Sequence, residues 1–373
     1  MKWEYGRRRR GRGTGRRRAL ILGLLILAIV VAGYVLIEFG VLPWPLDIAG
    51  AGRGEGTQRA DGAGGGEDAE YVESQFLMDT YVSIRAVGPG ARQAVGAAFD
   101  EMRRIEALTS RFVATSDVSC INQGAGGDPV QVSDETFMLL EKARECSELS
   151  GGAFDITIGP VVDAWGFGTD KPHVPDAPVL ARALSLVNWR ALELDPGGKT
   201  VRLPLPGMSV DLGGIAKGYA TDRAAMVLRD HGIQHALIDA GGNIVAVGGR
   251  PDGKPWRIGI RDPRGENPAD TIGPVIVVED AAVVTSGDYE RFFVDNGQRY
   301  YHIFDPSTGK PAGLARSATV IAKSSCDADM LSTAVFVLGP EKGLEVVESL
   351  DGVFAMVVGA DGGLSFSSGF PGR

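Results

Sequence analysis

An uncharged run of nineteen residues, 19–37, restricts where this chain can build a globular fold. The run reads ALILGLLILAIVVAGYVLI. As a helix rising 1.5 Å per residue it would reach roughly 28 Å, close to the thickness of a bilayer's hydrocarbon core. Residues 1–18 carry nine Lys and Arg against one acid. Because positive flanks stay in the cytoplasm, we predict a basic cytoplasmic segment at 1–18 and a transmembrane anchor at 19–42.

A cleaved signal sequence is the alternative interpretation of the same run. Its small-residue cleavage site would be Ala49-Gly50-Ala51, which lies far from the core of the apolar run. We favour the uncleaved anchor. Both interpretations place the rest of the chain outside the cytoplasm.

The next stretch is a Gly-rich segment that cannot bury a core. Residues 47–69 hold eight Gly and no large apolar residue after Ile48, which is typical of a flexible tether. We therefore predict a linker at 43–70 and one folded domain at 71–373. The chain is 44% hydrophobic and its formal net charge is −9, so the domain can bury a core and would repel nucleic acid.

The periodicity of the folded part predicts an α+β domain rather than a regular βαβ alternation. Strand-like residues at 71–87 are interrupted at Met78-Asp79. We expect helices at 91–109, 133–151, 176–187, after 214, at 327–338 and from Pro340 onward. Short strands are expected at 201–203, 235–239, 243–247, 256–261, 274–279, 282–285, 299–304, 317–322 and 353–358.

Two glycine-containing turns suggest ligand contacts. The first, Gly151-Gly152-Ala153-Phe154-Asp155, indicates either an aromatic pocket with a carboxylate or simply a helix C-cap leading into the core. The second, Asp211-Leu212-Gly213-Gly214 followed by Lys217, places free N–H groups and a cation at a helix start. That arrangement attracts phosphate, although alone it is also compatible with an ordinary glycine turn.

Two further segments carry polar groups in chemically useful places. Asp329 and Thr333 are four residues apart, so on a helix they share a face and could hold a hard cation such as Mg²⁺. His302 precedes the turn Asp305-Pro306-Ser307-Thr308-Gly309. A lone His is more often structural than catalytic, so its role depends on what else lies nearby.

Taken together and in order, these motifs resemble the FAD:protein FMN transferases, the ApbE-type flavin transferases. The resemblance runs from about Met78 to the C-terminus and includes GGAFDITIGPVVDAWGFG, VDLGGIAKGYATDRA, IDAGGNIVAVG, VTSGDYERFF, YHIFDPSTGKP and SCDADMLSTAVFVLG. It implies a single two-lobed α+β domain with FAD, the substrate, in the cleft between the lobes. It also implies Mg²⁺-dependent transfer of FMN to a Ser or Thr hydroxyl of an acceptor protein, with release of AMP.

The resemblance also implies roles for individual residues. The expected FAD contacts are Met78, Phe112, Ala153, Phe154, Asp155, Asp211, Lys217 and Ile303. The expected metal ligands are Gly214, through its carbonyl, Asp329 and Thr333. The acceptor hydroxyl needs a base, for which His302 and Asp288 are the candidates. Asp79 replaces a Gly of the family's Met-Gly-Thr motif, and Cys120 stands where Arg is common.

The implied partners follow from the same resemblance. Family acceptors carry a Ser/Thr-Gly-Ala-Ser/Thr-like segment and include exported or membrane redox subunits. Ser307-Thr308-Gly309-Lys310 has Lys where that segment has Ala, so we expect a separate acceptor. We expect the protein at the bacterial inner membrane with its catalytic domain outside the cytoplasm. An FAD pyrophosphatase that yields FMN and AMP, or a non-catalytic flavin-binding module, remains the alternative.

Overall fold

The computed structural model of the protein describes residues 58–59, 70–267 and 269–372. The predicted cytoplasmic segment 1–18, the anchor 19–42 and most of the linker 43–70 lie outside these residues. In the part of the chain that is described, no helix is both long enough and apolar enough to cross a membrane.

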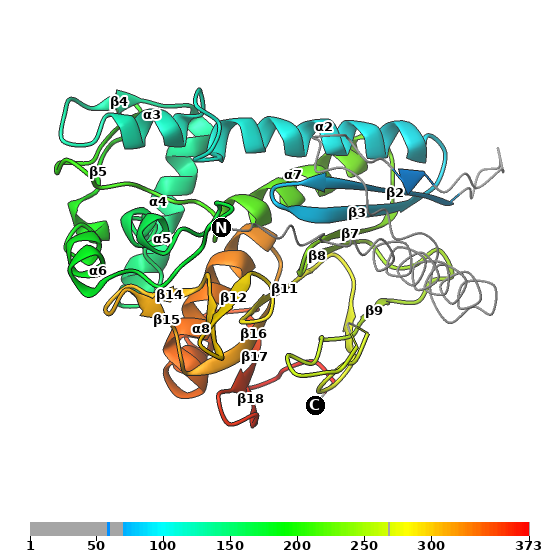
Figure 1. The fold of residues 1–373 in the computed structure, drawn as a ribbon. Helices are drawn as coiled ribbons and strands as arrows, with labels where there is room; N and C mark the ends of the chain where they lie inside the picture. The colour runs from blue at the N-terminus through cyan, green and yellow to red at the C-terminus, as the bar shows by residue number, and fades with distance from the viewer. Residues whose placement is uncertain (1–57, 60–69, 268, 373) are drawn as a thin grey trace, which may run out of the picture. The chain divides into compact units, whose positions relative to one another are not determined.

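A nine-stranded sheet in which all neighbouring strands are antiparallel organises the fold (Figure 1). The strands, in spatial order, are β1 (Gln58–Arg59), β2 (Glu70–Leu77), β3 (Thr80–Val87), β7 (His235–Ala240), β8 (Asn243–Val247), β11 (Ala282–Gly287), β16 (Ala315–Ala322), β17 (Phe354–Gly359) and β18 (Leu364–Phe366). Alternate residues of these strands face opposite sides, so both faces of the sheet need cover.

The predicted interruption at Met78-Asp79 is confirmed as a two-residue hairpin turn. Strands β2 and β3 pair from Glu70 opposite Val87 to Leu77 opposite Thr80. Met78 and Asp79 both have positive φ, 53° and 58°, the backbone conformation that two-residue hairpins with the native strand twist require. Asp79 therefore adopts the conformation for which the family's Gly is suited.

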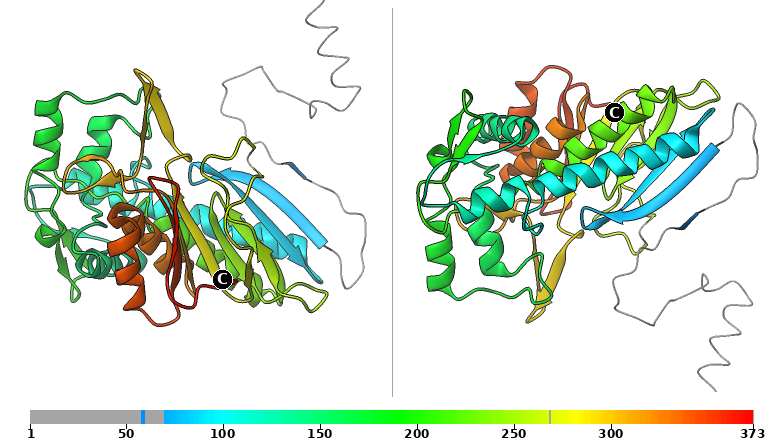
Figure 2. Two further views of the ribbon diagram at one scale, coloured as in Figure 1. Left: turned by 90° about the horizontal axis from the view of Figure 1, so that it is seen from below. Right: turned by 90° about the horizontal axis from the view of Figure 1, so that it is seen from above.

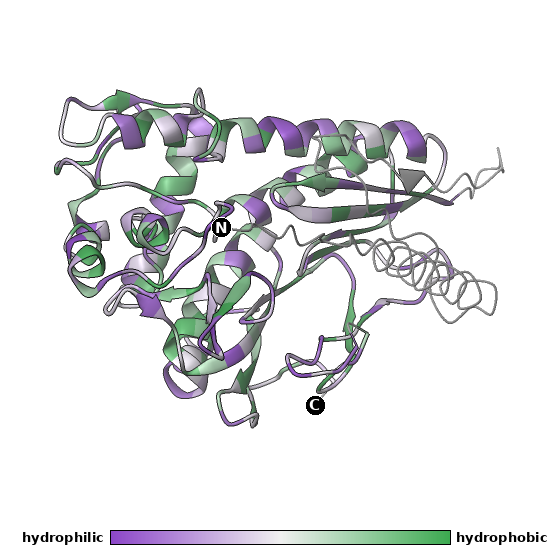
Figure 3. Cartoon of the chain, viewed as in Figure 1, coloured by the Kyte–Doolittle hydropathy of each residue, from purple (hydrophilic) through white to green (hydrophobic). Residues whose placement is uncertain are grey.

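Three long helices cover one face of the sheet: α2 (Ala91–Thr109), α7 (Ala216–Asp230) and α8 (Ser325–Glu348). Figures 1 and 2 show α2 running along this face, and Figure 3 shows hydrophobic and hydrophilic residues alternating along it. Its buried row includes Val95, Phe99 and Met102, spaced three and four residues apart. The main hydrophobic core lies between these helices and the sheet.

The other face of the sheet is covered by a smaller element. Strands β9 (Trp256–Ile258) and β10 (Ile276–Val278) pair with each other. Their buried side chains form a second core with outward-facing residues of the main sheet such as Val283 and Ile321. Their opposite side leaves Arg257 and Val277 exposed.

A helical part is built mainly from residues 110–212. It contains α3 (Asp117–Gln123), α4 (Asp134–Leu149), α5 (Gly159–Trp165), α6 (Ala177–Leu184), the 3₁₀ turn η1 (Trp189–Ala191) and the short strands β4 (Val130–Gln131), β5 (Glu193–Asp195) and β6 (Thr200–Arg202). Two hairpins from the later chain also belong to the periphery: β12 (Phe292–Asp295) with β13 (Gln298–Tyr301), and β14 (Phe304–Asp305) with β15 (Lys310–Pro311).

Several predicted element boundaries are confirmed. Ser133 caps α4, because its side chain accepts a hydrogen bond from the Thr136 N–H. The predicted division of the last helix is a kink in α8 at Gly339, whose φ of 74° is followed by Pro340. Helices α3 and α5 were not predicted. In α5, Gly159-Pro160 suggests a break, whereas Pro is tolerated in a helix's first turn.

Candidate active site

A cleft of about 460 Å³ is lined by residues from the helical part, from α7 and α8 and from the ends of several strands. This volume lies in the range of small-molecule sites. Twelve of the thirteen predicted site residues line it: Met78, Phe112, Ala153, Phe154, Asp155, Asp211, Gly214, Lys217, His302, Ile303, Asp329 and Thr333. The cleft therefore brings together segments more than two hundred residues apart in the sequence.

One side of the cleft, here called the helix wall, consists of Gly214, Lys217, Asp329 and Thr333. Lys217 lies in the first turn of α7 and the two polar residues lie in α8. The helices can approach closely because Gly218 lacks a side chain. A Cβ on Gly218 would come 2.3 Å from the Ser325 carbonyl oxygen and 2.7 Å from Asp329 Cβ. The backbone N–H of Gly218 donates to Asp329 Oδ2 at 2.8 Å.

Lys217 is a largely buried cation, with 18% of its side chain exposed, and it has neighbours on both sides. Its Nζ donates to Asn243 Oδ1 and lies 4.0 Å from Asp329 Oδ1. Burial lowers the pKa of Lys217, and the Asp329 carboxylate opposes that shift. A cation placed at a helix N-terminus is unfavourable with respect to the helix dipole. An anionic ligand in the cleft would compensate for both the burial and the dipole.

The predicted metal ligands lie together and fit a hard cation. Asp329 is 5% exposed, and its Oδ1 lies 4.0 Å from Lys217 Nζ. Thr333 Oγ1 lies 3.3 Å from the Asp329 carbonyl oxygen. Gly214 is close to the same hydroxyl, because a Cβ atom added to Gly214 would lie 3.5 Å from Thr333 Oγ1. Carboxylate, hydroxyl and carbonyl oxygens are the donors that Mg²⁺ takes. In the described ranges, no three His, Cys, Asp or Glu residues are grouped so as to hold a metal.

A second group of cleft residues, here called the aromatic wall, consists of Phe112, Ala153, Phe154, Phe167 and Ile303, and the Phe154 ring adjoins Gly214 of the helix wall. Phe154 and Ile303 are buried, whereas Phe112 is 58% exposed. The Phe112 ring lies against Gly168, where a Cβ would come 2.4 Å from the ring. A flat apolar group can therefore be enclosed between fixed and exposed rings.

Two predicted contact carboxylates are already engaged within the protein. Asp155 Oδ1 accepts hydrogen bonds from the Thr157 N–H and hydroxyl, both at 2.7 Å, and Oδ2 accepts from the Trp189 N–H. Burial raises its pKa. Asp211 Oδ1 accepts from the Gly213 N–H at 2.8 Å and Oδ2 from Arg111 at 3.0 Å. These bonds fix the two turns that the sequence motifs identify.

His302 lies at the end of the aromatic wall. Its Nδ1 contacts the Arg291 carbonyl oxygen at 3.3 Å, and its ring lies 6.5 Å from that of Phe167. Burial, assisted by the positive charge of Arg291, lowers the pKa of His302 to about 4. The imidazole is therefore neutral near pH 7 and keeps a lone pair that can accept a proton, although a pKa this low makes it a weaker base than an ordinary histidine.

Asp288, the other predicted base, does not line the cleft. Its two carboxylate oxygens accept hydrogen bonds from the Arg264 guanidinium at 2.8 and 2.5 Å, and it is 4% exposed. The chain leaves β11 at Gly287 and turns, so Asp288 lies on the side away from the cleft while Glu290 lines it. The geometry thus places Asp288 in a structural ion pair.

Five charged residues that line the cleft were not predicted as site residues: Asp79, Glu106, Arg111, Glu290 and Arg291. Glu106 accepts a hydrogen bond from the Met78 N–H at 3.0 Å, and burial raises its pKa. Arg111 binds Asp163 through two 2.7 Å bonds. Glu290 and Arg291 lie within the quoted segment VTSGDYERFF, and Arg111 immediately precedes Phe112; these positions were the available signal.

The fold and the cleft define a class of α+β proteins in which a helix N-terminus with a largely buried Lys and a set of aromatic side chains line the same cleft. The ApbE family model matches residues 78–357, and the chain belongs to this family.

Known proteins of the family are similar over most of this chain. A FAD:protein FMN transferase of Treponema pallidum is 37% identical over 322 residues, 82% of this chain and 88% of that protein. One of Klebsiella pneumoniae is also 37% identical, over 76% of this chain and 88% of that protein. A crystal structure of an ApbE protein from Thermotoga maritima matches with a TM-score of 0.76 and 35% identity, covering 82% of this chain and 100% of that one.

Proposed function

We propose that this protein transfers FMN from FAD to a Ser or Thr hydroxyl of an acceptor protein and releases AMP. The observation that carries the proposal is the joining of the helix wall and the aromatic wall in one cleft. FAD has a flat ring system linked to a pyrophosphate. The aromatic wall suits the ring system, and the helix wall suits the pyrophosphate. The names of the similar proteins support the same assignment.

The proposed reaction breaks one bond of the pyrophosphate and forms one ester. The acceptor hydroxyl oxygen attacks the phosphorus on the FMN side, and the bond from that phosphorus to the bridging oxygen breaks. AMP leaves with the bridging oxygen. The hydroxyl proton passes to His302, which is neutral because its pKa is about 4.

The helix wall orients and neutralises the phosphates in this scheme. Lys217, in the first turn of α7, provides a positive charge in a largely buried position, while the Gly218 N–H holds Asp329 in place. Gly214, Asp329 and Thr333 would hold Mg²⁺. When bound, Mg²⁺ supplies positive charge to the pyrophosphate oxygens, whose charge increases as AMP leaves. With one carboxylate in the set, coordination positions remain for phosphate oxygens and water.

The location of the reaction is part of the proposal. The basic segment 1–18 and the apolar run 19–37 support an anchor in the bacterial inner membrane with the catalytic domain outside the cytoplasm. The acceptor is then an exported or membrane redox protein with a Ser/Thr-Gly-Ala-Ser/Thr-like segment.

A mass measurement tests the proposal. The full chain in detergent is incubated with FAD, Mg²⁺ and a peptide that carries the acceptor segment. A peptide mass increased by one FMN, and unchanged when EDTA is added, is the expected result. Free FMN and AMP with unmodified peptide would identify a pyrophosphatase. Bound, intact FAD with neither product would identify a flavin-binding module.

A further inference from the structure

Ser286, near the end of β11, lines the cleft beside the helix wall. Its Oγ lies 2.8 Å from Ser332 Oγ and 3.4 Å from Thr333 Oγ1, both in α8. Val284, two residues earlier on the same strand, belongs to the main core between the sheet and the helices, so Ser286 faces the helices as well. The sheet therefore brings one more hydroxyl to the place where Thr333 and Asp329 fit a hard cation.

The direction of each hydrogen bond in this group follows from the protons available. A hydroxyl has one proton to donate and two lone pairs, whereas a carbonyl oxygen only accepts. Ser332 Oγ lies 2.9 Å from the Asp329 carbonyl oxygen, so Ser332 donates its proton there. Ser286 is then the donor in its 2.8 Å bond to Ser332. Thr333 donates to the same Asp329 carbonyl at 3.3 Å.

These directions leave two hydroxyl oxygens close together with no proton between them. Ser286 Oγ and Thr333 Oγ1 are 3.4 Å apart, and each hydroxyl donates its proton elsewhere. A hard cation beside both oxygens would remove the repulsion between their lone pairs. Adjacent oxygen ligands that lie about 2.1–2.4 Å from such a cation are about 3.0–3.4 Å from each other. The observed separation therefore suits two ligands of one cation.

The surrounding structure holds Ser286 in this position before any cation binds. Strand β11 pairs with β8 as far as Val284 and with β16 as far as Gly287. Ser332, which accepts the Ser286 proton, is fully buried, whereas Ser286 itself is half-buried. The sheet fixes the backbone and Ser332 fixes the hydroxyl proton, so the lone pairs of Ser286 are oriented in advance.

We propose that Ser286 Oγ is a further ligand of the cation that Gly214, Asp329 and Thr333 would hold. Ser332 is then a positioning residue, because it takes the Ser286 proton. A hydroxyl is neutral, so it fills a coordination position without reducing the positive charge that the cation presents to the pyrophosphate. This inference rests on the metal site of the proposed function, and it does not depend on the acceptor.

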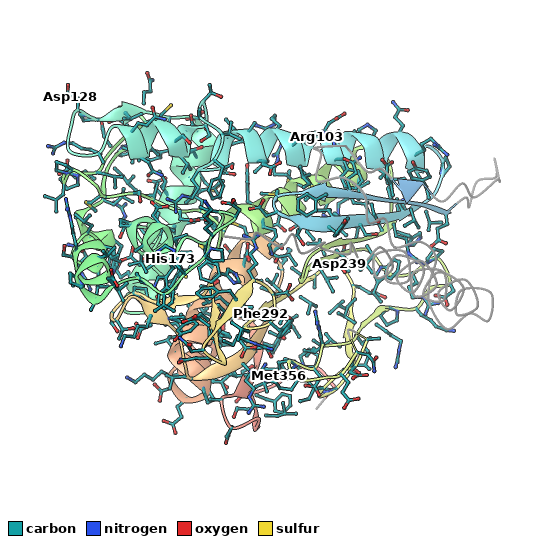
Figure 4. All side chains as sticks on the ribbon, in the orientation of Figure 1. Arg103, Asp128, His173, Asp239, Phe292 and Met356 are labelled. Atoms are coloured by element: carbon teal, nitrogen blue, oxygen red, sulfur yellow. The ribbon has the colours of Figure 1, made fainter. Side chains whose placement is uncertain are left out.

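Mn²⁺ binding tests this ligand without FAD or an acceptor. The probe is Mn²⁺ alone, and the EPR signal of free Mn²⁺ is followed in titrations of the full chain in detergent. Ser286→Ala should raise the Kd for Mn²⁺ about tenfold, and Asp329→Asn should abolish binding. Ser317→Ala is the matched control, since Ser317 Oγ on the neighbouring strand β16 is buried with no hydrogen-bond partner among the described residues. Asp128→Asn, at an exposed position labelled in Figure 4, is the control for a lost carboxylate. Both controls should bind Mn²⁺ as the wild type does.

Ser286→Cys distinguishes a ligand from a residue that only positions Thr333. A thiolate favours soft cations over hard ones. The variant should bind Mn²⁺ as weakly as Ser286→Ala but bind Cd²⁺, measured by calorimetry, about tenfold more tightly than the wild type. The wild type contains the exposed Cys120, so the comparison accounts for Cd²⁺ bound there. Weaker Mn²⁺ binding by Ser286→Ala without tighter Cd²⁺ binding by Ser286→Cys would overturn the assignment as a ligand. So would equal Mn²⁺ affinities of Ser286→Ala and the wild type.

The outcomes separate this inference from the proposed function. A wild type that binds Mn²⁺ through Asp329 and Ser286 but transfers no FMN would support the ligand and count against the transferase alone. A wild type that transfers FMN, with Mn²⁺ affinity unchanged in Asp329→Asn, would remove the metal site and Ser286 with it. Thermal unfolding shows whether each variant is folded, and Ser286→Cys, which is close in shape to the native residue, provides the test if Ser286→Ala is not.

Discussion

The two walls of the cleft are built in different ways. The helix wall is formed by α7 and α8, whose separation is set by backbone contact at Gly218, and its polar groups are bonded mostly to one another and to the backbone. The aromatic wall is formed by loops and strand ends, and its outermost ring, Phe112, is largely exposed.

This difference separates fixed chemistry from adaptable binding. Charged groups that act on a developing charge are effective when they are already in place. Aromatic rings that enclose a flat ligand can shift slightly without weakening the electrostatic stabilisation that the charged groups provide. We therefore expect substitutions in the helix wall to reduce the rate of FMN transfer strongly. Substitutions in the aromatic wall should reduce the affinity for FAD moderately.

The largest effect is expected for Asp329→Asn. The amide can still accept a hydrogen bond from the Gly218 N–H, but the negative charge that would hold Mg²⁺ is lost. We expect the rate of FMN transfer to fall about a thousandfold, the scale of one lost electrostatic contact in an active site. Quenched-flow measurement of AMP release provides the rate. Asp327→Asn, on the same helix but paired with Lys142 at the surface, is the control; equal losses in both variants would contradict the assignment.

His302→Gln tests the end of the aromatic wall and should reduce the transfer rate about a hundredfold, a typical contribution of a general base. The Kd for FAD should change little, which would distinguish a role in proton transfer from one in binding. His231→Gln is the control, because His231 bonds the Val227 carbonyl at the end of α7. A normal rate in His302→Gln would exclude it as the base.

The pH dependence follows from the same side chain. The pKa of His302 is about 4 in the folded protein and 6.5 in an unperturbed chain. As the pH falls from 6.5 to about 4, the unfolded chain binds a proton that the folded protein does not, so the free energy of unfolding decreases. Urea titrations across this range should show a shallower decrease for His302→Gln. The transfer rate of the wild type should stay level from pH 7 to 5 and fall only near pH 4.

Gly218→Ala tests whether the helix wall depends on close backbone contact. The added methyl would lie 2.3 Å from the Ser325 carbonyl oxygen. We expect this overpacking to lower the free energy of unfolding by roughly 2 kcal/mol. Gly96→Ala in α2 is the matched control, since no atom lies within 4 Å of its added Cβ. In that control the free energy of unfolding should rise by about 0.5–1 kcal/mol, because Ala favours a helix more than Gly does. Thermal unfolding measures both; unchanged stability in Gly218→Ala would show that the helices can separate at low cost.

Phe112→Ala should have the smallest effect. Phe112 is partly exposed, so its removal should raise the Kd for FAD about fivefold, the equivalent of roughly 1 kcal/mol of ring contact. Leu205→Ala, at a similarly exposed position outside the cleft, provides the comparison. Flavin fluorescence quenching measures both, and a thousandfold change at Phe112 would remove the contrast between the two walls.

The sequence predicted those parts of the site that depend on local spacing. Asp329 and Thr333 share a face because the helical period brings i and i+4 together. Lys217 lies in a first helical turn because the glycine turn Gly213-Gly214 precedes it. The helix positions in the α+β domain could be predicted for the same reason.

The parts that depend on turns and distant pairing could not be predicted. Asp288 and Glu290 are two residues apart, and only the path of the chain after β11 decides which one enters the cleft. Arg111 is fixed by Asp163 and Asp211, which are 52 and 100 residues away. The strand β12 was also missed, because its exposed Phe and Val do not show the alternation of a half-buried strand.

The contact at Gly218 has a consequence for the cost of catalysis. Two hydrogen bonds hold these charges before a ligand arrives: the Gly218 N–H holds the Asp329 carboxylate, and Asn243 Oδ1 holds the Lys217 ammonium. The entropy needed to order these charges is therefore lost when the protein folds. Each turnover then begins with the dipoles already aligned, so little reorganisation energy is added to the barrier.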